Sequence, residues 1–75
     1  MKRATVRTRH SHPEVVAAAL APDNTDEMAT QVDGDYVETV VERESATGLR
    51  STVDDYVVNL TVAQRIADLT DTNTP

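Results

Sequence analysis

The chain contains no phenylalanine, tryptophan or cysteine in its 75 residues. Its hydrophobic content of 39% must therefore pack as valine, alanine and a few leucines, with tyrosine as the one large aromatic side chain. A core of this size is expected to leave about 3 to 5 kcal/mol of stability, and without cysteine no disulfide or thiolate zinc site can add to it. We expect oligomerisation to supply the missing stability.

The charge is acidic overall. Seven basic and thirteen acidic residues give a net charge of -6 and an isoelectric point near 4.6, which argues against a surface that is basic throughout and binds nucleic acid. Arginine outnumbers lysine, aspartate outnumbers glutamate, and valine, threonine and alanine are abundant, which favours a halophilic source with a cytoplasm of high salt. No apolar leader opens the chain and no apolar run approaches the ~18 residues of a membrane span, so we expect a soluble, cytoplasmic protein that does not contact membranes.

The first half of the chain predicts a strand, a helix and a second strand. Residues 2–9 alternate between polar and apolar side chains, which is the period of a half-buried strand. Ser11 and Glu14 form the pattern of a capping box, with a proline in the first turn, and predict a short helix that stops before Pro22. Turn-forming residues follow, and the next strand is expected over residues 27–32.

The dipeptide Asp33-Gly34 stands between two alternating segments and predicts a β-hairpin with a two-residue type I′ turn. The turn implies a register in which the opposed pairs are Val32 with Asp35, Thr30 with Val37, and Met28 with Thr39. The side chains expected on the core side are Met28, Val32, Val37 and Val41. Those expected on the other side are Tyr36, Glu38, Val40 and Glu42.

A long second helix is predicted over residues 49–69, after a short loop that ends in glycine. Ser51 or Thr52 is its expected N-cap. Asp54 and Asp55 would then lie near the positive end of the helix dipole.

Together these elements predict a single α+β domain over residues 1–75. Its three-stranded antiparallel sheet would carry both helices on one face. The polar residues 70–75 are expected to form a frayed tail.

The long helix has two apolar stripes on roughly opposite sides. One consists of Val53, Tyr56, Val57, Leu60, Ala63 and Ala67. The other consists of Val58, Val62, Ile66 and Leu69. One stripe can cover the sheet, and the second either packs on the short helix or docks on a partner helix. Because the short helix offers few apolar side chains, we favour docking and take the second stripe as the candidate docking residues.

The sequence contains few residues suited to a catalytic or cofactor site. The serines suited to be nucleophiles are expected caps, and the glycines lie in predicted turns, so we expect neither an enzyme nor a cofactor. His10, His12 and Glu14 could hold a metal ion, because alternate residues of an extended segment share a face. A solvated connection between strand and helix explains both histidines without a metal, and we favour that interpretation.

The first strand carries a row of basic residues, Arg3, Arg7 and Arg9. As a basic stripe they could contact RNA phosphates, and a stand-alone RNA-binding module is the alternative function. They could also neutralise Glu38, Glu42 and Glu44 on the same sheet face, at about 0.2 to 1 kcal/mol per pair, which we favour. In molar salt any contact with RNA would be auxiliary, because phosphate contacts weaken steeply.

Three segments together resemble a known family. They are residues 49–60, LRSTVDDYVVNL; residues 20–24, LAPDN; and the Asp33-Gly34 hairpin. In their order along the chain they are similar to the Pcc-type (CTAG/Pcc family) dimerisation subunit of the KEOPS (EKC) complex. The resemblance spans nearly the whole chain, and its motifs are helix and turn patterns without catalytic groups.

The resemblance implies a homodimer in which two sheets join into one six-stranded antiparallel sheet. It implies a non-catalytic scaffold whose helices dock on the threonylcarbamoyl transferase subunit of KEOPS, which installs threonylcarbamoyladenosine next to the anticodon of tRNA. The matching helix-start residues are Arg50, Thr52, Asp55, Tyr56 and Leu60, and Pro22-Asp23 matches the family's loop. Tyr56 stands where phenylalanine is frequent, and Asp55 where asparagine is common.

Overall fold

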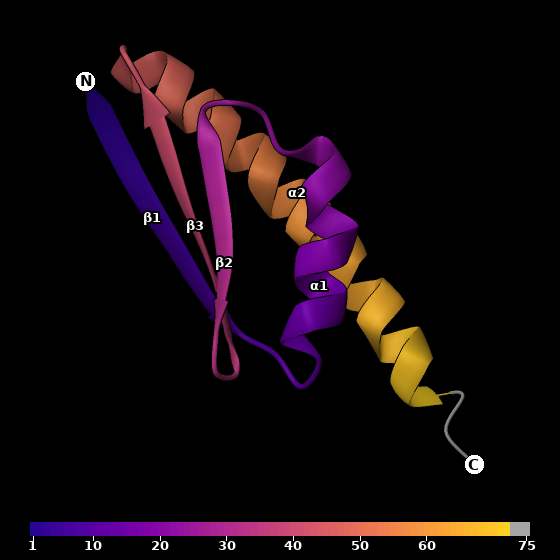
Figure 1. Ribbon diagram of the computed structural model, residues 1–75. Helices are drawn as coiled ribbons and strands as arrows, with labels where there is room; N and C mark the ends of the chain where they lie inside the picture. Colours follow the sequence, from indigo (N-terminus) through magenta and orange to yellow (C-terminus); the bar gives the residue numbers. More distant parts are fainter. Residues whose placement is uncertain (73–75) are drawn as a thin grey trace.

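The computed structural model describes residues 1–72, with side chains up to residue 69. Along the chain lie β1 (Lys2–Arg9), α1 (Pro13–Leu20), a 3-10 turn (Ala21–Asp23), β2 (Met28–Asp33), β3 (Tyr36–Arg43) and α2 (Ala46–Thr72) (Figure 1). The predicted α+β class and the order of its elements are confirmed.

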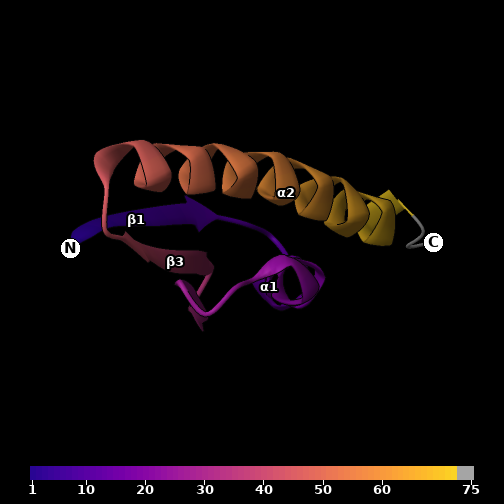
Figure 2. The ribbon, with the colours of Figure 1, turned by 90° about the horizontal axis from the view of Figure 1, so that it is seen from above.

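The three strands form an antiparallel sheet in the order β1-β3-β2. Both helices lie on one face of this sheet: α2 packs over β1 and β3, and α1 packs beside it over β3 and β2 (Figure 2). β3 is therefore the central strand. Within residues 1–72 the outer edges of β1 and β2 pair with no further strand.

The predicted hairpin register is wrong by two residues. Val32 pairs with Val37, Thr30 with Thr39, and Met28 with Val41. The loop consists of Gly34 and Asp35, and Gly34 has a φ of 59° while no other described residue has a positive φ. A type I′ turn needs positive φ at both central residues, whereas type II′ needs it at the first alone, so Gly34 supports a type II′ geometry.

A shift of two residues leaves each side chain on its predicted face. Val37 and Val41 are fully buried on the core side, and Met28 is partly buried. Val32 lies on the same side but keeps 39% of its surface exposed, because it sits at the end of the outer strand β2.

The predicted capping box at the start of α1 does not form. The helix begins at Pro13, so His12 is the N-cap residue and no side chain caps it. Ser11 precedes the capping position by one residue and cannot fill it. The predicted end before Pro22 is confirmed, because the α-helix stops at Leu20.

The helix α2 begins earlier than predicted. Ser45 caps it, with its Oγ accepting a hydrogen bond from the Gly48 backbone N–H at 3.0 Å. Ser51 and Thr52 are therefore interior residues, and no acidic residue lies in the first turn, so the predicted role of Asp54 and Asp55 at the helix dipole is wrong. The helix extends to Thr72, past the predicted end, and the last three residues of the expected frayed tail lie outside the described ones.

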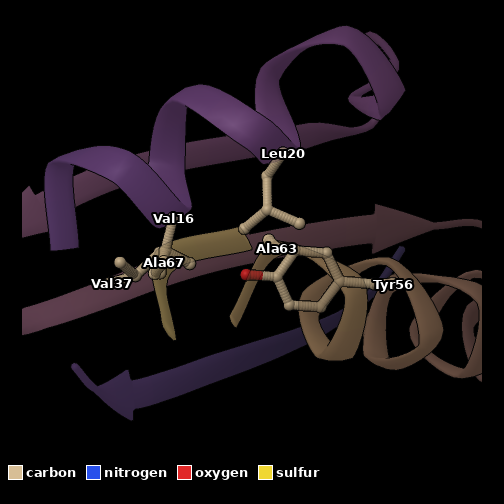
Figure 3. Close-up of a cluster of buried hydrophobic side chains, with 6 residues drawn as sticks. All are labelled: Val16, Leu20, Val37, Tyr56, Ala63 and Ala67. Carbon is tan, nitrogen blue, oxygen red and sulfur yellow. The ribbon is translucent and has the colours of Figure 1, made fainter. Parts of the chain in front are cut away.

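The core lies between the sheet and the two helices. Six buried side chains converge there from α1, β3 and α2 (Figure 3): Val16, Leu20, Val37, Tyr56, Ala63 and Ala67. The largest side chain among them, and the one aromatic ring, is that of Tyr56.

One buried polar residue lies beside this cluster. Thr39 is fully buried and shares a hydrogen bond with Thr30 on β2 at 2.8 Å. Asn24 in turn donates its side-chain N–H to Thr30 at 2.9 Å. These hydroxyl contacts were not anticipated from the sequence, although threonines at core-facing strand positions are the signal for them.

Candidate docking helix and charged sheet face

The second apolar stripe of α2 is exposed along its length. Val58 is 63% exposed, Val62 51%, Ile66 45% and Leu69 61%. We call these four residues the outer stripe. Large aliphatic side chains at positions i, i+4, i+8 and i+11 form a continuous apolar strip on a helix, which is the pattern of a surface that receives another helix.

The outer stripe is exposed because the core uses the other side of α2. Tyr56, Ala63 and Ala67 are buried, and Leu60 is partly buried against them. The short α1 packs against this inner side. Val57, which was predicted to face the sheet, is 47% exposed, because it lies at the margin of the inner stripe.

Charged residues flank the outer stripe. Asp54 and Asp55 are exposed near its N-terminal end, and Arg65 is exposed near its C-terminal end. An apolar centre with a charged rim is the usual composition of a protein-protein contact.

The basic row of β1 lies on the sheet face that no helix covers, and acidic residues accompany it. Arg3 forms an ion pair with Glu42 at 3.4 Å, and the two residues lie directly opposite each other in the sheet. Arg9 lies 3.8 Å from Asp35 in the hairpin loop. Glu44, the third glutamate expected here, follows the last residue of β3.

Arg7 has the most partners of this row. It contacts Glu38, directly opposite on β3, at 3.0 Å and Asp33 on β2 at 3.3 Å. Its guanidinium also lies 4.2 Å from the centre of the Tyr36 ring, within the range of a cation-π contact. The hydrogen bond to Glu38 is the main cause of a raised pKa for Arg7.

These contacts favour cross-strand neutralisation over phosphate binding. Each of the three arginines has a carboxylate within 4 Å, so an RNA phosphate would have to displace an acidic neighbour. The expected RNA contact through Arg3, Arg7 and Arg9 remains a prediction.

The candidate metal site is not assembled. His10 has both ring nitrogens in hydrogen bonds, one with Thr8 at 2.6 Å and one with Gln64 on α2. Among the described residues no three histidine, cysteine, aspartate or glutamate side chains lie close enough to hold a metal ion. His10 therefore acts as a polar bridge between the end of β1 and α2.

The residues that carry the family resemblance do not form one surface. Tyr56 is buried and Leu60 is partly buried in the core, whereas Arg50 and Asp55 are exposed. Thr52 accepts a hydrogen bond from Arg43 at 2.6 Å, which ties the end of β3 to α2. Most of these helix-start residues therefore stabilise the fold and do not form a binding surface.

No protein-family model matches the chain, and no curated protein matches it significantly. Within the described part of the chain, no helix has both the length and the apolar character to cross a membrane.

Proposed function

We propose that this chain is a non-catalytic, homodimeric scaffold subunit of a KEOPS-type complex in the cytoplasm. In this role it supports threonylcarbamoyladenosine modification of tRNA by docking α2 on helices of the threonylcarbamoyl transferase subunit. The sequence resemblance supports the identity of the complex, and the exposed apolar surface of α2 supports the docking role.

The observation that carries the proposal is the outer stripe. A small acidic protein gains nothing by exposing four large aliphatic side chains in one row on a helix unless another molecule covers them. The stripe lies on the side of α2 away from the sheet, so docking would leave the sheet and its edges unobstructed.

The test is a pull-down of the transferase subunit by the Val62→Asp variant. A carboxylate in the middle of the outer stripe would have to be buried unpaired in the docked helix pair, so we expect binding to be lost. Val62 is half exposed in the free chain, so the variant should keep its circular dichroism spectrum and melting temperature.

Thr61→Asp is the matched control. It places the same charge on the neighbouring residue of α2, which is exposed but lies off the outer stripe. This variant should bind the transferase like the unmodified chain. Retention of binding by Val62→Asp, or equal loss in both variants, would refute the docking assignment.

Binding of RNA by the chain alone is the competing function. The ion pairs of Arg3, Arg7 and Arg9 weigh against it. A gel shift with tRNA that needs no partner protein and disappears when these arginines are replaced by serine would establish it.

A further inference from the structure

We infer that the outer face of α2 also packs against the same face of a second copy, with the two helices antiparallel and centred at the level of Leu60. This contact covers the surface that would dock the transferase, so the two occupants exclude each other. The competition rests on the proposed function, whereas the packing of α2 on α2 does not.

The side of α2 away from the sheet carries residues at the spacing of a coiled coil, and no other element covers this side (Figure 2). At alternating intervals of four and three residues lie Ser51, Asp55, Val58, Val62, Arg65 and Leu69. We call these six residues the outer row, and each of them is exposed. Such intervals are those of the a and d positions that form the seam between two coiled helices. The outer row contains three members of the outer stripe, and the fourth, Ile66, lies beside it.

The outer row is symmetric about the level of Leu60. Its members lie in pairs at equal distances before and after this residue. In an antiparallel helix pair centred there, the residues that meet across the seam are Ser51 with Leu69, Asp55 with Arg65, and Val58 with Val62. Each pair joins an a position to a d position, so every member of the outer row meets another member.

The charges of the outer row select the antiparallel direction. An antiparallel pair brings Asp55 of each copy to Arg65 of the other, whereas a parallel pair would set each residue against its own like charge. Like charges brought together at a contact are costly, and antiparallel helices also oppose their dipoles favourably. Within the part of the chain whose side chains are described, neither residue has an ion-pair partner, so both charges are available.

The same charges select the register. A midpoint moved by half a heptad, about 3.5 residues, would set Arg65 against Val62 in one direction or Asp55 against Val58 in the other. Either shift would bury a charge against an apolar side chain without a partner, which is unfavourable. The register centred at Leu60 keeps valine on valine and charge on opposite charge.

The contact is small. The outer row offers six residues a side along about 27 Å of helix, whereas a stable interface uses about 20 to 30 residues a side. Association of the two helices is therefore weak, and a partner with a larger contact can displace it. While no such partner is bound, self-packing shields Val58, Val62 and Leu69 from water.

The test is disulfide formation between Val58→Cys and Val62→Cys, two variants of a chain that has no cysteine of its own. In the antiparallel pair a thiol at 58 of one copy faces a thiol at 62 of the other. Two thiols at the same position lie on opposite sides of the midpoint, about 6 Å apart along the helix axis. We therefore expect an equimolar mixture to form a covalent dimer at least about tenfold faster than either variant alone.

Faster cross-linking of each variant with itself would show parallel packing and overturn the inference, as would the absence of any covalent dimer. A second measurement tests the charges. In dilute buffer, Arg65→Asp added to both variants sets carboxylate against carboxylate and should slow cross-linking about fivefold. Adding Asp55→Arg to these chains restores opposite charges and should restore the rate. An unchanged rate with Arg65→Asp would refute the assigned pairing.

The transferase subunit separates this inference from the proposed function. In excess it should suppress cross-linking of the mixture, because it covers the same face of α2. Cross-linking that persists while the transferase is bound supports self-packing and removes the assigned docking surface. A successful pull-down of the transferase together with no cross-linking of the mixture leaves the docking proposal standing and overturns self-packing.

Discussion

Thr39 donates its hydroxyl hydrogen to the phenolic oxygen of Tyr56 at 2.6 Å, and both side chains are at least 99% buried. The contact joins the central strand to the long helix. It also gives the hydroxyl of Tyr56 a structural role.

Removal of that hydroxyl should destabilise the fold. For Tyr56→Phe we expect the free energy of unfolding in urea to fall by about 1 kcal/mol, because Thr39 loses one of its buried partners. Tyr36→Phe is the control: Tyr36 lies on the uncovered sheet face, and its contact with Arg7 is made through the ring. Equal losses in the two variants would contradict the role assigned to Tyr56.

The same residue should make stability sensitive to alkaline pH. Burial raises the pKa of Tyr56 above its ordinary value of 10.0, and the hydrogen bond from Thr39 lowers it by less. Above pH ~10 the unfolded chain releases this proton while the folded chain keeps it, so the free energy of unfolding decreases as pH rises, at up to about 1.4 kcal/mol per pH unit. Comparison of urea midpoints at pH 9 and above pH ~10 should show a smaller decrease for Tyr56→Phe.

Truncation of a core leucine should nearly unfold the isolated chain. Leu20 is 1% exposed, and Leu20→Ala is expected to cost about 2 to 5 kcal/mol, comparable with the whole stability of a domain of this size. Leu69→Ala removes the same atoms from a side chain that is 61% exposed, and it should change stability by less than about 0.5 kcal/mol. Thermal melts of the two variants provide the measurement. Similar melting temperatures would mean that α1 does not contribute to the core as described.

Replacement of Arg7 should have an effect that depends on salt. Arg7→Gln removes the ion pairs with Glu38 and Asp33, and we expect a small loss of melting temperature in dilute buffer. At about 1 M salt the Debye length is near 3 Å, so the difference from the unmodified chain should shrink. Arg50→Gln, a change on the exposed surface of α2, should show no such dependence.

Periodicity in the sequence is sufficient to predict the strands, the helices and the faces they bury. The alternation of residues 2–9 became β1 over the same residues. The two stripes of α2 separated into buried and exposed sides, because the period of 3.6 residues fixes which side chains can share a face. The sequence therefore predicts the outer stripe, although it does not show which molecule covers it.

The ends of the elements were harder to predict, because they depend on single contacts. The sequence predicts that Gly48 ends a loop, yet it lies inside α2, where an added Cβ would lie 3.0 Å from Ser45 Oγ and 3.1 Å from Arg43 Nη2. Helix propensity alone disfavours glycine at this position by about 1 kcal/mol. The side chains of Ser45 and Arg43 leave little room for a Cβ here, which is a reason for glycine that helix propensity does not contain. The predicted hairpin register is wrong for a similar reason. The sequence does not show whether Gly34 is the second residue of the loop, as predicted, or the first, as observed.

The hydrogen bond between the hydroxyls of Thr30 and Thr39 helps to set the register of the hairpin. The alternative register, offset by two residues, would leave each side chain on its own face of the sheet. The hydrophobic effect would therefore favour both registers equally. It would also set Thr39 against Met28 and deprive the threonine of its hydroxyl neighbour. In a core built from small, similar side chains, the Thr30–Thr39 hydrogen bond distinguishes the correct register from the shifted one, which hydrophobic contacts alone do not do.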